Sequence, residues 1–319
     1  MTNKKIDNIK NVFICNWVFH LMISIWYILK YHSKINSKII IFNDNNFISE
    51  SILNQLIHEK FDILKIENKT LIEKYIKPCF LNFQEYKNIK KTYLFINYPF
   101  WNQIILNKFK KSKKVLLEEW IASYRKWNEN DSFFNKILSI FNLKITNIWW
   151  NHTSIDILFC RFPAEIQNSL CLPVKEENIL KPYLDNIIYI KSLFNVETYS
   201  YTNDDLIFLS NSFVFENKKE YIEKISEILN NKKYKNKNIY IKLHPRENYD
   251  LFNNLKIEYQ FIPKHIPVEL IWNNTNILTF YSSSILNLDS NITLIKFKNN
   301  EDYNTLKNIA NKYVKKIHL

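Results

Sequence analysis

Short apolar runs alternate with segments of helical periodicity along most of the chain. Helical patterns cover residues 48–58 and 101–111, and residues 131–142 show one more amphipathic pattern. The apolar runs of the first half are NVFIC (11–15), KIIIF (38–42), DILKI (62–66), TYLFI (92–96) and KVLLE (114–118). Short continuous apolar strands that alternate with helices are typical of a parallel sheet covered by helices on both faces.

A second alternating set follows a looser stretch, about 172–204, which carries prolines and charges. Its apolar runs are DLIFLS (205–210), NIYIKL (238–243), YQFIP (259–263), NILTFY (276–281) and ITLIKF (292–297). Helices are predicted over 218–229, 268–273 and 303–315. Because 319 residues exceed the usual size of one domain, we expect two. The predicted architecture is an α/β fold of two Rossmann-like domains, residues 1–180 and 181–319, whose parallel sheets face a central cleft.

The segment from Val12 to Leu29 is mostly apolar and long enough to raise the question of a membrane span. Asn16, His20 and Ser24 interrupt it, and no small-residue cleavage site follows that would indicate a signal peptide. A buried strand that ends near residue 15, followed by an amphipathic helix over about 19–31, accounts for the same residues without a membrane span.

The composition is that of a folded protein with a strong basic surplus. Hydrophobic residues make up 46% of the chain, aromatic residues 16%, and the formal net charge is +13. Such a charge favours anionic partners, such as nucleotides, acidic glycans, anionic lipid or nucleic acid, although many lysines of a Lys-, Asn- and Ile-rich chain are solvated surface. The four cysteines have no CxxC spacing and are interpreted as reduced, mostly buried thiols, at positions Cys15, Cys79, Cys160 and Cys171.

The sequence contains no glycine. Average usage of about 7% would give roughly 22 glycines in a chain of this length. Backbone positions with φ > 0 must therefore be filled by other residues, and Asn, Ser and Asp are the residue types expected there. Motifs that depend on glycine cannot be found in this chain by their usual pattern.

Candidate chemistry stands where the predicted strands end, because ligands of open parallel sheets bind beyond the carboxyl ends of the strands. Glu118 and Glu119 follow the run KVLL, and adjacent carboxylates there can act as a general base or hold a metal. A solvated acidic pair in a loop is the alternative. His244 and Pro245 follow NIYIKL, beside Lys242. This imidazole can donate a proton or bind a phosphate, unless it is only a loop histidine beside a turn proline.

Two further groups of polar residues lie at predicted element boundaries. Ser282, Ser283 and Ser284 follow NILTFY and precede an apolar helix start. Hydroxyls and free amides in that position can bind phosphate or carboxylate, and simple N-capping is the alternative. Glu269 stands at the start of a short predicted helix that Pro267 opens.

The order of these groups resembles the bacterial sialyltransferases, most closely glycosyltransferase family 52 and the related capsule polysialyltransferases. Those families share an acid-acid-Gly motif, a His-Pro motif and a Ser-Ser/Thr motif, and they have a two-domain GT-B fold. The resemblance extends to NVFICNWVFHLMI at residues 11–23 and DLIFLSNSFVFEN at 205–217. It therefore covers most of the chain at low identity, with motifs that are specific mainly by their order.

The resemblance implies a role for each motif residue. Glu118 and Glu119 correspond to the acidic pair, one of which takes the proton from the acceptor hydroxyl. His244 corresponds to the histidine that protonates or hydrogen-bonds the departing phosphate of CMP. Lys242 would add positive charge at that phosphate, and Pro245 would stiffen the exit from the strand.

The donor-binding residues follow in the same way. Ser282, Ser283 and Ser284 correspond to the hydroxyl cluster on the phosphate or carboxylate of the donor, and Glu269 resembles the acid that holds the ribose of the nucleotide. Trp120 departs from the pattern, because the family has glycine at this position. An indole there is expected to affect acceptor entry or the orientation of the glutamates.

The implied activity is inverting transfer of sialic acid from CMP-sialic acid to a surface glycan that ends in galactose or sialic acid. No DxD pair stands at a strand exit, so we expect no metal and no further cofactor. The expected location is cytoplasmic, at the inner face of a bacterial membrane, where basic patches give weak attachment to anionic lipid. Family relatives can dimerise, so a homodimer is compatible with the resemblance.

Three alternatives stay open at this point. A relative with the same fold can use another sugar nucleotide. A basic α/β protein rich in aromatic residues can bind nucleic acid without being an enzyme. Against this, the aromatic residues lie mostly inside apolar runs, and the lysines form no clustered stripe. A folded, glycine-free relic of a transferase would bind CMP without turnover.

Overall fold

The structure is a computed structural model, and it falls into two compact units, Met1–Leu193 and Phe194–Leu319. Both are α/β units in which all strand pairs among the described residues are parallel. The residues it describes are 9–42, 48–67, 88–95, 100–118, 124, 155–166, 172–179, 185–196, 200–211, 217–244, 247–271, 275–288, 290–296, 301–314 and 317–318.

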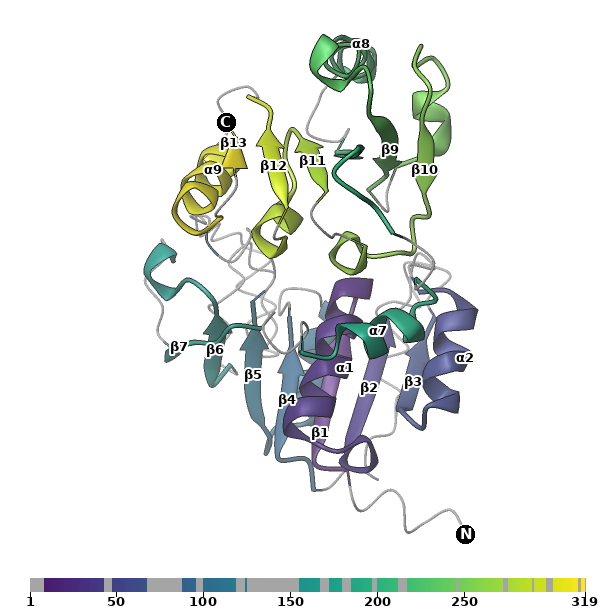
Figure 1. Ribbon diagram of the computed structural model, residues 1–319. Helices are drawn as coiled ribbons and strands as arrows, with labels where there is room; N and C mark the ends of the chain where they lie inside the picture. The colour runs from purple at the N-terminus through teal and green to yellow at the C-terminus, as the bar shows by residue number, and fades with distance from the viewer. Residues whose placement is uncertain are drawn as a thin grey trace. The chain divides into compact units, whose positions relative to one another are not determined.

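The first unit holds a seven-stranded sheet of order β3-β2-β1-β4-β5-β6-β7 (Figure 1). Its strands are β1 Asn11–Cys15, β2 Ser37–Phe42, β3 Asp62–Ile66, β4 Lys91–Leu94, β5 Lys113–Leu117, β6 Ile157–Cys160 and β7 Val174–Glu176. The helices are α1 Val18–Tyr31, α2 Glu50–His58, α4 Phe100–Lys108 and α7 Ile187–Leu193, with 3₁₀ turns η2 Lys34–Asn36 and η4 Pro163–Glu165. The five predicted strands are confirmed within two residues at each end, whereas β6 and β7 were not predicted, and the helix predicted over 131–142 lies outside the described residues.

The long apolar segment near the N-terminus consists of a central strand and the helix that covers it. All five residues of β1 are buried, and so is every side chain of α1 from Phe19 to Ile28. α1 packs on β1 and β2, so the apolar run fills the core of this unit. In the described part of the chain, no helix is long and apolar enough to cross a membrane.

The second unit holds a six-stranded sheet of order β10-β9-β8-β11-β12-β13 (Figure 1). Its strands are β8 Asp205–Leu209, β9 Asn238–Lys242, β10 Gln260–Ile262, β11 Asn276–Thr279, β12 Asn291–Leu294 and β13 Ile317–His318. The helices are α8 Lys218–Leu229 and α9 Glu301–Tyr313, with 3₁₀ turns η6 Lys232–Tyr234, η7 Tyr249–Phe252, η8 Val268–Leu270 and η9 Ser283–Asn287. The five predicted strands and both longer helices are confirmed, and the short β13 was not predicted.

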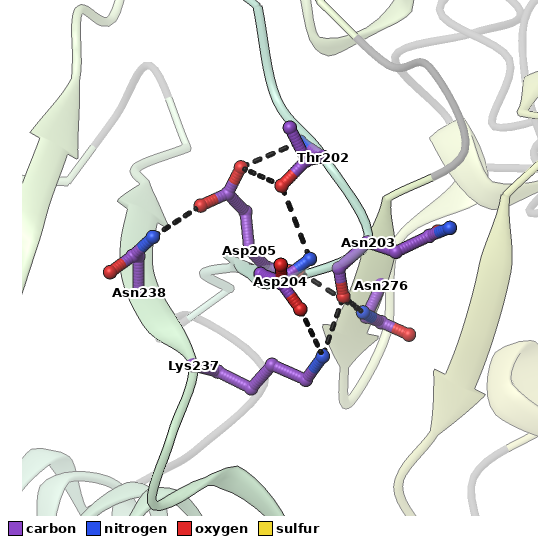
Figure 2. A network of polar contacts seen from close by, with 7 residues as sticks. All are labelled: Thr202, Asn203, Asp204, Asp205, Lys237, Asn238 and Asn276. Carbon is purple, nitrogen blue, oxygen red and sulfur yellow. Dashed lines mark hydrogen bonds and ion pairs between the residues drawn. The ribbon is translucent and has the colours of Figure 1, made fainter.

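Polar side chains fix the amino ends of three neighbouring strands in this sheet (Figure 2). The Asp205 carboxylate, at the start of β8, accepts hydrogen bonds from the Thr202 backbone N–H at 2.6 Å and from the Asn238 amide, at the start of β9, at 2.9 Å. The Asn276 amide, at the start of β11, donates to the Asn203 carbonyl at 2.7 Å. Asp and Asn side chains thus form hydrogen bonds with the backbone groups of a turn that contains no glycine. The register of β8, β9 and β11 is set at this end, which fixes the positions of the residues at the opposite ends of these strands.

Two residues of the described chain adopt the left-handed conformation, Lys60 with φ of 65° and Asn195 with φ of 55°. Asn195 is of a residue type expected there, whereas a lysine was not. Lys60 ends α2: its N–H donates to the Ile57 carbonyl at 2.9 Å, and the Phe61 N–H donates to the Leu56 carbonyl at 3.0 Å. These two bonds form a Schellman motif, in which the residue at the position of Lys60 is usually glycine.

The two units divide between Leu193 and Phe194, later than the boundary of 180/181 that we placed inside the looser stretch. The reason lies in α7, which packs on α2. The Tyr189 hydroxyl accepts a hydrogen bond from Lys34 Nζ at 2.8 Å and donates one to Glu59 Oε2 at 2.9 Å. These contacts attach α7 to the first unit.

Two of the four cysteines fall in the described residues. Cys15 and Cys160 are free thiols and are buried, as predicted. Burial raises the pKa of each to about 12, so both are protonated at neutral pH and unreactive. Cys79 and Cys171 lie outside the described residues.

Candidate functional site

Glu118 follows β5 directly and is fully buried, with an exposure of 0%. Arg161, the first residue after the neighbouring strand β6, holds it. The Arg161 backbone N–H donates to Glu118 Oε2 at 2.7 Å, its Nε donates to Oε1 at 3.0 Å, and its terminal nitrogen forms an ion pair with Oε1. Both carboxylate oxygens are therefore occupied by protein donors. Glu119 and Trp120 lie outside the described residues.

A second polar group at the same edge of the first sheet was not recognised as a candidate site. Asn16 follows β1, and its backbone N–H donates to His20 Nδ1 at 3.1 Å. The Asn102 side-chain amide donates to Asn16 Oδ1 at 3.2 Å, and the His20 ring stacks on Phe95 with centroids 4.3 Å apart. Burial lowers the pKa of His20 well below its ordinary value, so the ring is neutral and accepts at Nδ1. The sequence signal was present, because Asn16 and His20 are two of the polar residues that interrupt the apolar run.

His244 lies two residues beyond β9 and is partly buried. Its backbone N–H donates to Glu247 Oε2 at 3.0 Å, and the Glu247 backbone N–H donates to the His244 carbonyl at 2.9 Å. His244 and Glu247 are therefore joined by hydrogen bonds in both directions. Glu247 is buried, with an exposure of 5%, and it was not among the predicted site residues. Pro245 and Arg246 lie outside the described residues.

Lys242, the last residue of β9, is buried with an exposure of 8%. Its Nζ donates to the Leu243 carbonyl at 3.2 Å and to the Lys264 carbonyl at 3.1 Å. Burial lowers the pKa of Lys242 to about 8, and the nearby Glu269 carboxylate opposes this effect. The ammonium group is thus held between the exit of β9 and the turn that follows β10.

Glu269 is the middle residue of η8 and is buried with an exposure of 3%. Its Oε1 accepts a hydrogen bond from the Asn287 amide at 3.1 Å, and Ser284 provides a further hydrogen bond. Burial raises the pKa of Glu269, and these hydrogen bonds and the charge of Lys242 partly counteract the increase. The structure thus brings Glu269 together with Ser284, a residue of the predicted serine cluster.

The serine cluster follows β11. Ser283 is buried, and Ser282 and Ser284 are partly exposed. Ser282 stands at the N-cap of η9, yet its side chain makes no capping hydrogen bond. The alternative explanation, that the serines serve as simple caps, is therefore wrong for the Ser282 side chain.

The predicted residues of the second unit gather at the carboxyl edge of its sheet, where the strand order reverses. β8 is followed in sequence by β9 on one side, while β11 lies on its other side. Asn211, two residues after β8, donates its side-chain amide to the carbonyl of Tyr281, two residues after β11. Asn211 was not predicted as a site residue, although open α/β sheets bind ligands at such a switch point. Lys242, His244, Glu269 and the serines are the predicted residues of this edge, whereas Glu118 belongs to the first unit.

Among the described residues, no group of three or more His, Cys, Asp or Glu side chains could hold a metal ion. The expectation of metal-independent chemistry stays a prediction, because residues beside Glu118 and His244 lie outside this part of the chain.

Comparison with solved structures identifies the fold. UDP-GlcNAc 2-epimerase from Methanocaldococcus jannaschii, in complex with UDP-GlcNAc and UDP, aligns with a TM-score of 0.55 at 15% identity, over 97% of this chain and 93% of that one. Arabidopsis thaliana UGT89C1, complexed with UDP-L-rhamnose, aligns with a TM-score of 0.53 at 10% identity, over 98% and 84%. UDP-GlcNAc 2-epimerase from Neisseria meningitidis, bound to UDP-GlcNAc, gives a TM-score of 0.50 at 14% identity, over 96% and 90%. No protein-family model matches the sequence, and no curated protein matches it.

The chain has the GT-B fold, with two parallel α/β units, as the resemblance to family 52 implied. At these identities the likeness is one of fold, and the activity has to be argued from the site.

Proposed function

We propose that the protein is a nucleotide-sugar-dependent glycosyltransferase whose donor is CMP-sialic acid and whose acceptor is a surface glycan that ends in galactose or sialic acid. The observation that carries the proposal is the cluster at the carboxyl edge of the second sheet. There, Lys242 and Glu269 are buried ionisable groups, and Glu269 is hydrogen-bonded to Asn287 beside the serines. Buried ionisable groups at a topological switch point are typical of a ligand site.

Each residue of this cluster has a task in the proposed reaction. Glu269 would hold the ribose hydroxyls of the nucleotide. Ser282 and Ser284, which are partly exposed, would donate to the phosphate or to the sialic acid carboxylate. His244 would donate a proton or a hydrogen bond to the phosphate as it leaves, a contribution of about 10²–10⁴-fold in rate. Lys242 would act as a fixed positive charge nearby, since its ammonium group already donates to two carbonyls.

The base that deprotonates the acceptor hydroxyl is assigned to the Glu118–Glu119 pair. Arg161 occupies both oxygens of Glu118, which supports an orienting role for Glu118 and leaves Glu119 as the base. Glu119→Gln should then abolish transfer, whereas Glu118→Gln should act mainly through stability. If only Glu118→Gln abolishes transfer in a folded protein, the assignment within the pair is reversed.

The direct test is a donor screen with purified protein, in which products are identified by mass. The expected product is a sialylated glycan from CMP-sialic acid, formed in the presence of EDTA. His244→Ala should lower its rate at least about 10²-fold with the fold intact. A wild-type protein that transfers nothing from CMP-sialic acid, or a His244→Ala variant within about threefold of wild type, would contradict the proposal.

A UDP-sugar donor is the second candidate, because the three solved structures compared above contain UDP or a UDP-sugar. The same screen includes UDP-GlcNAc and UDP-rhamnose. A basic protein that binds nucleic acid would instead show salt-dependent affinity for DNA or RNA and no nucleotide-sugar turnover. Weak attachment to anionic membranes and a homodimer remain parts of the proposal that vesicle sedimentation and light scattering test.

A further inference from the structure

Glu247, which follows His244 by three residues, carries a buried carboxylate to which the sequence motifs gave no role. We propose that Glu247 is a positioning residue for His244, so that the functional unit is His-Pro-x-Glu and not His-Pro alone. The inference rests on the proposed function, because it concerns the same nucleotide site. It does not require Glu247 to contact a ligand.

The first support is the reciprocal pair of hydrogen bonds between the two residues. His244 gives its backbone N–H to Glu247 Oε2 at 3.0 Å, and Glu247 gives its own N–H to the His244 carbonyl at 2.9 Å. This pairing has the logic of a helix capping box, in which a side chain reaches back three residues to satisfy a backbone N–H. The carboxylate of Glu247 thus fixes the N–H of His244, and the backbone N–H of Glu247 fixes its carbonyl.

The second support is the contact between Glu247 and the residues that follow the neighbouring strand β10. Lys264 lies two residues after β10, and its Nζ donates to the Glu247 carbonyl. The Lys264 carbonyl in turn accepts from Lys242 Nζ at 3.1 Å, and the Lys264 ammonium lies 4.6 Å from the centre of the Tyr249 ring. Lys264 is therefore hydrogen-bonded to Glu247, and Glu247 connects the residues after β10 to His244.

The burial of Glu247 determines what a substitution at this position would do. Glu247 has an exposure of 5%, so a carboxylate there needs protein donors, and its removal takes this acceptor away from the partly buried His244 N–H. Catalytic geometry tolerates displacements of only about 0.5 Å. A change at Glu247 that lets the His244 backbone rotate would therefore displace the imidazole from a bound phosphate without removing any ligand contact.

The test uses two substitutions of similar size. Glu247→Gln keeps an oxygen that can accept the His244 N–H, while Glu247→Leu has none, and Glu258→Leu, at an exposed position of the same unit, is the matched control. The measurements are CMP affinity by calorimetry and the imidazole resonances of His244 by NMR. We expect Glu247→Leu to weaken CMP binding about tenfold and to move the His244 resonances, and Glu247→Gln and Glu258→Leu to stay within about threefold.

The inference is overturned if Glu247→Leu leaves both the affinity and the His244 resonances unchanged, or if Glu247→Gln is as harmful as Glu247→Leu. Should Glu247→Leu fail to fold, the wild-type protein decides. The His244 amide proton must be protected from exchange with solvent, and an amide proton that exchanges freely refutes the contact. If the wild type binds no nucleotide, the proposed function fails, whereas the NMR measurements still test the positioning of His244.

Discussion

Lys60 occupies a backbone position at which glycine is the usual residue, in a chain that has no glycine. It adopts φ of 65° at the end of α2, and its side chain is exposed. The perturbation is Lys60→Gly, which keeps the two backbone hydrogen bonds of the Schellman motif, at 2.9 and 3.0 Å. It removes only the Cβ and an exposed side chain, so no buried contact is lost.

The magnitude follows from two opposing effects. A residue with a Cβ costs about 1–2 kcal/mol in the left-handed conformation. Glycine avoids this cost, but it makes the unfolded chain more flexible, which opposes folding by about 0.5–1 kcal/mol. The net expectation is that Lys60→Gly raises the free energy of unfolding of the first unit by about 0.5–1 kcal/mol, or roughly 1–4 °C in Tm for a unit of this size.

The assay is urea unfolding followed by the fluorescence of the first unit, in which Trp26 is fully buried. Asn195→Gly is the comparison variant, because Asn195 also has a positive φ, 55°, and is exposed. Asn195 belongs to the second unit, so its effect is followed by far-UV circular dichroism, which reports the unfolding of both units. Asparagine tolerates this conformation better than lysine, so the control should change stability by only a few tenths of a kcal/mol, within the usual range of surface substitutions. A Lys60→Gly variant that is less stable than wild type, or a larger gain at Asn195, would refute the reasoning.

Two more predictions concern the first sheet. Arg161→Met should destabilise the first unit by about 3–5 kcal/mol, because it leaves the buried Glu118 carboxylate without its counter-charge. A loss of stability below about 1 kcal/mol in chemical unfolding would contradict this. So would a Glu118→Gln/Arg161→Met double variant whose loss equals the full sum of the two single losses. Burial lowers the pKa of His20, so below about pH 6.5 the unfolded chain binds a proton that the folded chain excludes. The contribution of His20 to stability is therefore complete above about pH 6.5 and falls by up to about 1.4 kcal/mol per pH unit below it. Wild type should therefore lose more stability than His20→Gln between pH 6.5 and 5, and parallel curves for the two proteins would show that the imidazole is not held neutral.

Most of the fold was predictable, because buried parallel strands are continuous apolar runs that stand out between amphipathic helices. β7 was missed because it has only three residues, of which Lys175 and Glu176 are exposed. Such a strand lies at the edge of a sheet, where one-sided burial leaves no apolar run. Lys60 could not be foreseen, because its conformation is imposed by its place between the end of α2 and the start of β3 and not by its own propensity.

The candidate site was predictable in the residues that follow strands, but not in their partners. Glu118 stands directly after its strand, as the sequence indicated, yet its contact with Arg161 joins residues 43 positions apart. Glu269 and Asn287 are 18 positions apart and meet only because η8 and η9 pack together. Glu247, by contrast, is three residues from His244, and the pattern His-x-x-Glu at a strand exit was a local signal that could have been recognised.

The central claim is that the carboxyl edge of the six-stranded sheet binds a nucleotide. Hydrogen–deuterium exchange with and without CMP tests it residue by residue on the intact protein. We predict added protection at residues 242–247, 267–271 and 282–288, and none at the amino-end turn around Asp205. Saturating CMP that leaves exchange at these three segments unchanged would contradict the account.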